Sequence, residues 1–208
     1  MKKTILTAVA VFLCAGFAFA DGDSTGTTTT VTGNGVEFEP IPQDLGGLDH
    51  SYYYTWGIDW QLPQNEVITS ATLSFLNINN SGELDDFLYV NLLDSAPWGV
   101  TAGYDGAASG NAFEGNGWLL TTYTDADEST PENFSYPFDA AQLSLLSGAI
   151  ANDGNFGFGF DPDCHYTNDG VKLALTTRVV PEPLAAELFL CGGGILSFVI
   201  GRKKKRSA

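Results

Sequence analysis

Four oxygen-bearing side chains occur within a short polar segment near the end of the chain, residues 161–170. They are Asp161, Asp163, Asn168 and Asp169. Ca²⁺ binds carboxylate and amide oxygens, typically about six to eight at once, so the segment is a candidate calcium site. It differs from an EF-hand loop, because Tyr166 stands where that loop requires glycine. The alternative is a turn in which Asp and Asn side chains accept hydrogen bonds from their own backbone.

The same segment contains residues that bind softer metals. Cys164 and His165 are adjacent, so in an extended backbone their side chains point to opposite faces. The other histidine, His50, is distant in sequence, and structural zinc needs four ligands. We therefore expect His50 to lie at a strand edge and His165 to form hydrogen bonds in a turn. For Cys164, burial, metal binding and intermolecular pairing all stay open.

Tryptophan is a residue type that stacks on sugar rings, and Trp98 is the best candidate for that role. It lies in Pro97-Trp98-Gly99, before a long stretch rich in glycine and alanine that would form the wall of a binding surface. Packing against the protein is the alternative for Trp98. Trp56 and Trp60 share parity with apolar neighbours and are expected in the core.

Catalytic motifs are missing from the sequence. It has no nucleophile elbow, no glycine-rich phosphate loop and no histidine-rich metal motif. Its many carboxylates would allow a glycosidase-like acid and base pair, but no spacing singles one out. We therefore expect that the protein is not an enzyme, and a polysaccharide-active enzyme is the least favoured alternative.

Short alternating segments predict an all-β fold that would position these side chains. Aromatic residues occupy one parity of 52–61, which predicts a half-buried strand, and 68–78 alternates similarly. Further strands are predicted at 86–93, 118–123, 134–138, 156–160 and 171–179. About eight strands separated by turns favour an antiparallel β-sandwich or jelly roll.

Three other segments are expected to have different conformations. Residues 21–35 are rich in Gly, Thr and Asp, which predicts a flexible leader. Residues 96–110 are expected to form a long loop, and 139–146 one or two helical turns capped by Asp139. We therefore divide the centre of the chain into a leader with a first strand at 21–49 and a folded ectodomain at 50–179.

The N-terminus predicts export. Lys2-Lys3 forms a positive region, 4–17 is apolar, and Ala18-Phe19-Ala20 is a cleavage pattern, so residues 1–20 are expected to be a signal peptide. Between Asp21 and Val180 lie 180 − 20 = 160 residues, enough for one domain.

The C-terminal segment 180–208 has three parts in a fixed order. Pro181, Glu182 and Pro183 precede the apolar stretch 184–201, whose eighteen residues would span about 27 Å as a helix, close to the ~30 Å of a bilayer core. The basic residues that follow are Arg202, Lys203, Lys204, Lys205 and Arg206. They favour a transmembrane helix with this end in the cytoplasm and the rest outside. An ordinary C-terminal anchor is one interpretation.

The order of these parts resembles the PEP-CTERM sorting signal of exported proteins from Gram-negative bacteria that make exopolysaccharide. The resemblance implies recognition of Pro181, Glu182 and Pro183 by an exosortase, a membrane transpeptidase that removes the tail. Segments 54–59, 71–75 and 158–166 also resemble the ectodomain of an uncharacterised subgroup of these proteins. That resemblance implies no activity. It supports treating 50–179 as one folded unit.

Charge narrows the set of partners. Lys172 and Arg178 are the only cations between Asp21 and Val180, against 23 acidic residues, which gives 2 − 23 = −21. A body with this much negative charge repels nucleic acid and anionic membranes, and we therefore expect neither as its partner. It attracts cations. Together these features predict a surface-sorted, non-enzymatic protein of the extracellular polysaccharide or biofilm layer. It would contact the membrane through its tail until processing, and a lectin-like module is the alternative.

Overall fold

The described part of the chain is almost entirely β-structure. The computed structural model describes residues 27–40, 44–80, 87–106, 110–125 and 130–180. These residues form two sheets in which all strand pairs are antiparallel, plus one helix. The all-β fold class is therefore confirmed.

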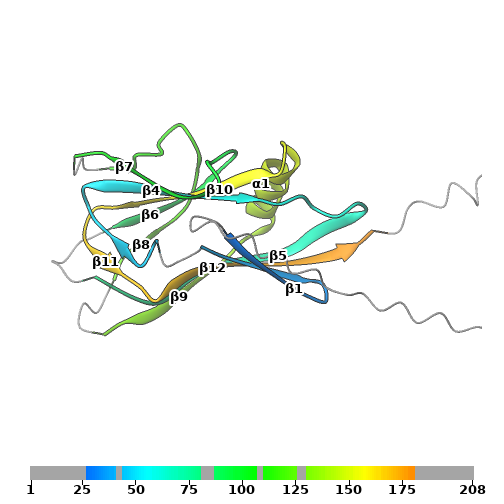
Figure 1. The fold of residues 1–208 in the computed structure, drawn as a ribbon, viewed down its shortest axis with the longest axis horizontal. Coiled ribbons are helices and arrows are strands. Elements are labelled where there is room, and N and C mark those ends of the chain that lie inside the picture. Colours follow the sequence, from blue (N-terminus) through cyan, green and yellow to red (C-terminus); the bar gives the residue numbers. More distant parts are fainter. Residues whose placement is uncertain (1–26, 41–43, 81–86, 107–109, 126–129, 181–208) are drawn as a thin grey trace, which may run out of the picture.

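The larger sheet has the order β1-β2-β12-β5-β11-β3, and β9 also pairs with β5. Its strands are β1 (Thr27–Thr32), β2 (Gly35–Pro40), β3 (Gly47–Leu48), β5 (Glu66–Asn80), β9 (Glu132–Pro137), β11 (Tyr166–Thr167) and β12 (Gly170–Val179). The smaller sheet has the order β7-β4-β10-β6-β8. Its strands are β4 (Tyr52–Asp59), β6 (Leu88–Leu93), β7 (Gly99–Tyr104), β8 (Trp118–Tyr123) and β10 (Asn155–Pro162). In Figure 1, β4, β7 and β10 lie above β5, β9 and β12.

Both sheets contribute large side chains to a shared core. Trp56 and Phe160 of the smaller sheet and Phe75 of the larger sheet are completely buried. Phe75 and Phe160 meet edge to face, with ring centroids 5.4 Å apart. Successive strand residues point to opposite faces, so the alternating burial of 71–75 confirms the pattern predicted for 68–78, whereas only the apolar parity of 52–61 is as predicted.

One helix, α1 (Ala140–Ala151), packs at one end of this core (Figure 1). Asp139 caps its N-terminus: the Asp139 side chain accepts from Gln142 N–H at 2.8 Å, and the Gln142 side chain accepts from Asp139 N–H at 2.9 Å. This capping box satisfies two backbone donors that would otherwise lack partners. The predicted cap is confirmed, and the helix is longer than expected because Ala149 and Ile150 continue its buried face.

The outer face of the smaller sheet is also covered. Glycines on this face leave room for the segments 94–98 and 110–117 to lie directly on the strands. A Cβ atom added to Gly57 would lie 1.9 Å from the Pro97 carbonyl oxygen, and one on Gly159 would meet the Phe113 ring. The strand predicted as half-buried is therefore buried on both faces along most of its length.

Two sequence predictions about irregular segments were wrong. Residues 27–32 of the expected leader form β1, because β-branched threonine favours extended backbone and β2 offers a complete partner edge. The expected loop 96–110 contains β7, where Gly103 lies beneath the Tyr53 ring. Because β1, β2 and β3 belong to the larger sheet, the folded unit begins before residue 50, where we placed its start.

Several predictions concern residues outside the described ranges. These are the signal peptide 1–20, the motif residues 181–183, the apolar stretch 184–201 and the basic residues 202–206. Within the described residues, no helix combines the length and hydrophobicity needed to cross a membrane.

Candidate metal centre

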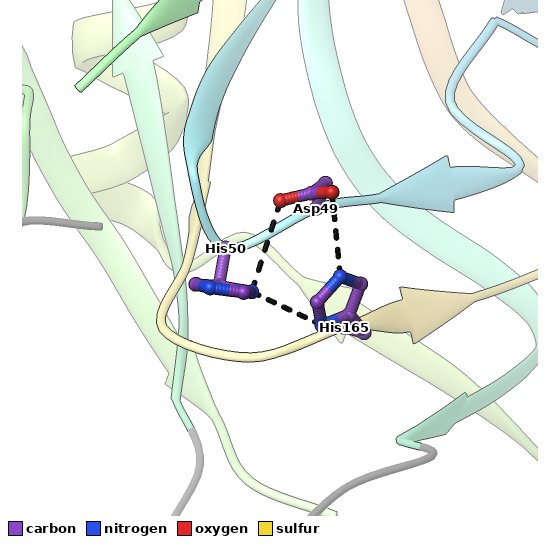
Figure 2. A group of neighbouring side chains, drawn as sticks. All are labelled: Asp49, His50 and His165. Carbon is purple, nitrogen blue, oxygen red and sulfur yellow. Dashed lines mark hydrogen bonds and ion pairs between the residues drawn. The ribbon is translucent and has the colours of Figure 1, made fainter. Parts of the chain in front are cut away.

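Two histidines and one carboxylate meet on the surface between distant parts of the sequence. Figure 2 shows Asp49, His50 and His165 facing one another. The two Nδ1 atoms of His50 and His165 are 3.0 Å apart, and His165 Nε2 lies 3.3 Å from Asp49 Oδ2. One candidate ligand atom from each residue lies within 4.8 Å of the other two. Among the described residues, this is the one group of three His, Cys, Asp or Glu residues close enough to hold an ion.

Pairing of two very short strands creates this meeting. In the antiparallel register of β3 and β11, Leu48 is opposite Tyr166, so the next position places Asp49 opposite His165. Leu48 and Tyr166 are both buried in the core, and they fix the register through their packing. The site is therefore positioned by core residues directly beside it.

A tight turn holds Asp49 and His50. Asp49 Oδ1 accepts from Ser51 N–H at 2.8 Å, and the Asp49 carbonyl accepts from Tyr52 N–H at 3.0 Å. Asp49 N–H donates to the Tyr54 hydroxyl at 2.9 Å. The hydrogen bond from Ser51 N–H lowers the pKa of Asp49, with the two histidines adding to this effect, so the carboxylate is ionised at neutral pH.

The cluster is open to solvent, and its side chains could adopt either a hydrogen-bonded or a metal-bound arrangement. The side chains of Asp49, His50 and His165 are 45%, 40% and 50% exposed. Without a metal, the cluster is satisfied if His50 Nδ1–H donates to His165 Nδ1 and His165 Nε2–H donates to Asp49. With a metal, one neutral imidazole nitrogen from each histidine and one carboxylate oxygen could serve as ligands, since such atoms lie within 4.8 Å of one another.

Sequence reasoning separated residues that the fold brings together. We treated His50 as too distant to assist His165, and Asp49 was not a candidate. The structure corrects this, since all three residues meet where β3 pairs with β11. Strands of only two residues have no recognisable sequence pattern, so this pairing could not be predicted. Cys164 packs against the hydrophobic core and is not in the cluster, as expected for neighbours on opposite faces of the backbone.

Three of the four candidate calcium ligands, Asp161, Asn168 and Asp169, form hydrogen bonds within the protein. Asp161 lies on the outer face of β10, whereas Asn168 donates to the Leu45 carbonyl at 2.6 Å and accepts from Gly170 N–H. Asp169 accepts from the Asn77 side-chain amide at 2.6 Å. Asp161, Asp163 and Asp169 do not form a group of the kind found at Asp49. At Asn168 the structure contains the alternative to a calcium site, a turn in which the side chain accepts a hydrogen bond from the nearby backbone.

Asp161 holds the segment 110–117 on the sheet. The residue is 1% exposed, and its Oδ2 accepts from Ala112 N–H at 2.6 Å. Beside it, the side-chain amides of Asn91 and Asn111 exchange two hydrogen bonds of 3.0 and 2.9 Å. Burial raises the pKa of Asp161 to about 6; the Ala112 N–H opposes this rise and the charge of Asp105 adds to it.

Trp98 lies on the surface, with 49% of the residue exposed. A single parallel bridge to Gly57 holds its backbone beside β4. Trp56 is completely buried and Trp60 packs against the core, as predicted for both. Trp118 is 37% exposed at the start of β8.

Comparisons of the sequence with protein-family models and with curated proteins found no match. The fold by itself therefore defines the class of protein: an all-β protein built from antiparallel sheets. Because one fold can serve many functions, function has to be argued from particular sites.

Proposed function

We propose that the chain is an exported, surface-sorted protein of the extracellular polysaccharide layer, and that it acts there without catalysing a reaction. An N-terminal signal peptide directs export, and a C-terminal transmembrane helix holds the chain in the inner membrane. An exosortase-type transpeptidase then processes the tail at Pro181, Glu182 and Pro183. The exported part is a β-sandwich of jelly-roll type.

One observation carries this proposal: the described fold is complete before the sorting motif begins. β12 ends at Val179, and Val180 N–H donates to the Asn65 carbonyl at 2.7 Å. Pro181 follows directly in the sequence. Cleavage at or after the motif therefore removes no residue of either sheet, so a stable domain is released. An apolar segment of membrane length after a completed domain is the arrangement that such processing requires.

The ends of the protein recovered from cells test this proposal. We expect mass spectrometry to find a mature chain that begins at Asp21 and ends near Pro181. Replacing Pro181, Glu182 and Pro183 by alanine should leave the C-terminal tail attached, whereas Val179→Ala, just outside the motif, should be processed normally. A reporter fused after Val180 should be active outside the cytoplasm. A cytosolic reporter, or an intact C-terminus in the unaltered chain, would contradict the proposal.

A carbohydrate-binding function is the second candidate, because Trp98 is half exposed. A flat indole face on the surface can stack on a sugar ring, and the polysaccharide setting supplies such rings. On a glycan array, the lectin-like function predicts a saturable signal that Trp98→Ala abolishes and Trp118→Ala retains. A purely structural function predicts no saturable signal for any of the three proteins.

A further inference from the structure

We propose that Asp49, His50 and His165 bind one divalent transition-metal ion of the Zn²⁺ class. The ion would take one imidazole nitrogen from each histidine and one oxygen from Asp49, and water would complete the coordination. This site is independent of sorting and of carbohydrate binding, because none of the three residues takes part in either proposal.

The distances between the side-chain atoms fit a shared ion. Tetrahedral zinc has bonds of about 2.0–2.1 Å to nitrogen and oxygen, which places ligand atoms about 3.3 Å from one another. The His50 and His165 Nδ1 atoms are 3.0 Å apart, whereas the 3.3 Å distance to Asp49 Oδ2 is measured from the other ring nitrogen of His165, Nε2. His50 Nδ1 and Asp49 Oδ1 are 3.7 Å apart. One ligand atom from each residue lies within 4.8 Å of the other two, so side-chain adjustment would bring the three atoms to the spacing that one ion requires.

The types of ligand determine the class of metal. Two imidazoles and one carboxylate suit Zn²⁺, Cu²⁺ or Ni²⁺, whereas Ca²⁺ and Mg²⁺ need mainly oxygen ligands. The side chains are about half exposed, so an ion can enter without unfolding and water can occupy the fourth position. The strongly acidic body also concentrates cations near its surface.

Such an ion would link two connecting segments that are distant from each other in the sequence. Asp49 and His50 lie between β3 and β4, and His165 lies between β10 and β11. The linked positions are 165 − 49 = 116 residues apart. A cross-link that closes so long a loop restricts the unfolded chain, so metal binding should stabilise the fold. The turn at Asp49 and the buried neighbours Leu48 and Tyr166 already hold the ligands near their bound positions.

Metal titration of the full chain, purified in detergent and stripped with EDTA, tests the proposal. We expect calorimetry to show one Zn²⁺ per chain and the melting temperature to rise with Zn²⁺. His50→Ala and His165→Ala should each weaken binding at least about tenfold, since each removes one of three protein ligands. Asp59→Asn, an exposed carboxylate on β4, is the matched control and should bind as the parent does.

A further variant distinguishes the loss of a metal ligand from disruption of the turn at Asp49. Asp49→Asn keeps an oxygen that can accept from Ser51 N–H but removes the negative charge, so it should fold normally and bind Zn²⁺ more weakly. Co²⁺ in place of Zn²⁺ should give visible d–d bands without a thiolate charge-transfer band, because Cys164 is not a ligand. No saturable Zn²⁺ binding, or equal affinity in both histidine variants and the parent, would show that the cluster is only a hydrogen-bonded network and would overturn the proposal.

Discussion

Asp161 illustrates how burial decides the role of a single side chain. In the sequence it is one of several acidic residues in a polar segment that suggests cation binding. In the structure it is buried on the outer face of β10 and accepts the Ala112 N–H. A carboxylate in that position costs free energy when it is ionised, and it is retained as an acceptor that fixes the covering segment.

This burial predicts an unusual pH dependence of stability. The pKa of Asp161 is about 6 in the folded protein, above its ordinary value of 3.8. Between these values the folded state binds a proton that the unfolded state releases, so this residue's contribution to stability is fully present below about pH 4. It is lost as the pH rises through about 6, by up to about 3 kcal/mol.

Asp161→Asn separates this effect from those of the other carboxylates. The amide oxygen can still accept from Ala112 N–H, and no charge has to be buried. We expect urea unfolding to show the variant more stable than the parent at pH 7 and nearly equal to it at pH 4. Asp59→Asn, on the surface, controls for the change in net charge. An identical difference between Asp161→Asn and the parent at both pH values would contradict the assignment.

At the scale of secondary-structure elements, glycines in the smaller sheet have a packing role. Gly57 on β4 allows the segment 94–98 to lie against the strand, and a single parallel bridge joins Gly57 to Trp98. Gly159 similarly accommodates the Phe113 ring. Glycine weakens a strand by itself, so its repeated use here is explained by the close approach of the covering segments.

Two glycine substitutions should therefore change stability in opposite directions. Gly57→Ala would place a methyl group 1.9 Å from the Pro97 carbonyl oxygen, which is backbone and cannot rotate away. We expect a loss of about 3 kcal/mol in the free energy of unfolding. Gly148→Ala, in α1, meets no atom within 4 Å and should gain about 1 kcal/mol through helix propensity. Denaturant unfolding of both variants measures this, and a Gly57→Ala protein as stable as the parent would refute the packing explanation.

For the whole molecule, charge and topology act together. The body from Asp21 to Val180 has only Lys172 and Arg178 as cations, and Lys172 lies 3.4 and 3.1 Å from Glu37 and Glu39. Glu39 raises the pKa of Lys172, so this cation stays charged and is already paired within the larger sheet. The remaining acidic surface favours solubility and the capture of metal cations, and it disfavours contact with other polyanions.

Much of the fold was predictable, because the alternation of apolar and polar residues along a strand indicates which of its side chains are buried. The strand at 118–123 was predicted at its observed boundaries, and Asp139 was recognised as a helix cap. The segments 27–32 and 99–104 were missed because exposed threonines and packed glycines resemble loop sequence. Their conformation depends on hydrogen bonds to β2 and on the Tyr53 ring, which the sequence does not place.

The sequence alone determined the fold class and the acidity of the body, since each depends on composition or on neighbouring residues. Tertiary structure decided that Asp161 is an internal acceptor, that Trp98 is exposed, and that Asp49 and His50 meet His165. Those outcomes depend on which strands pair and in which register. Register is set by core side chains from both sheets acting together, and no short stretch of the chain contains that information.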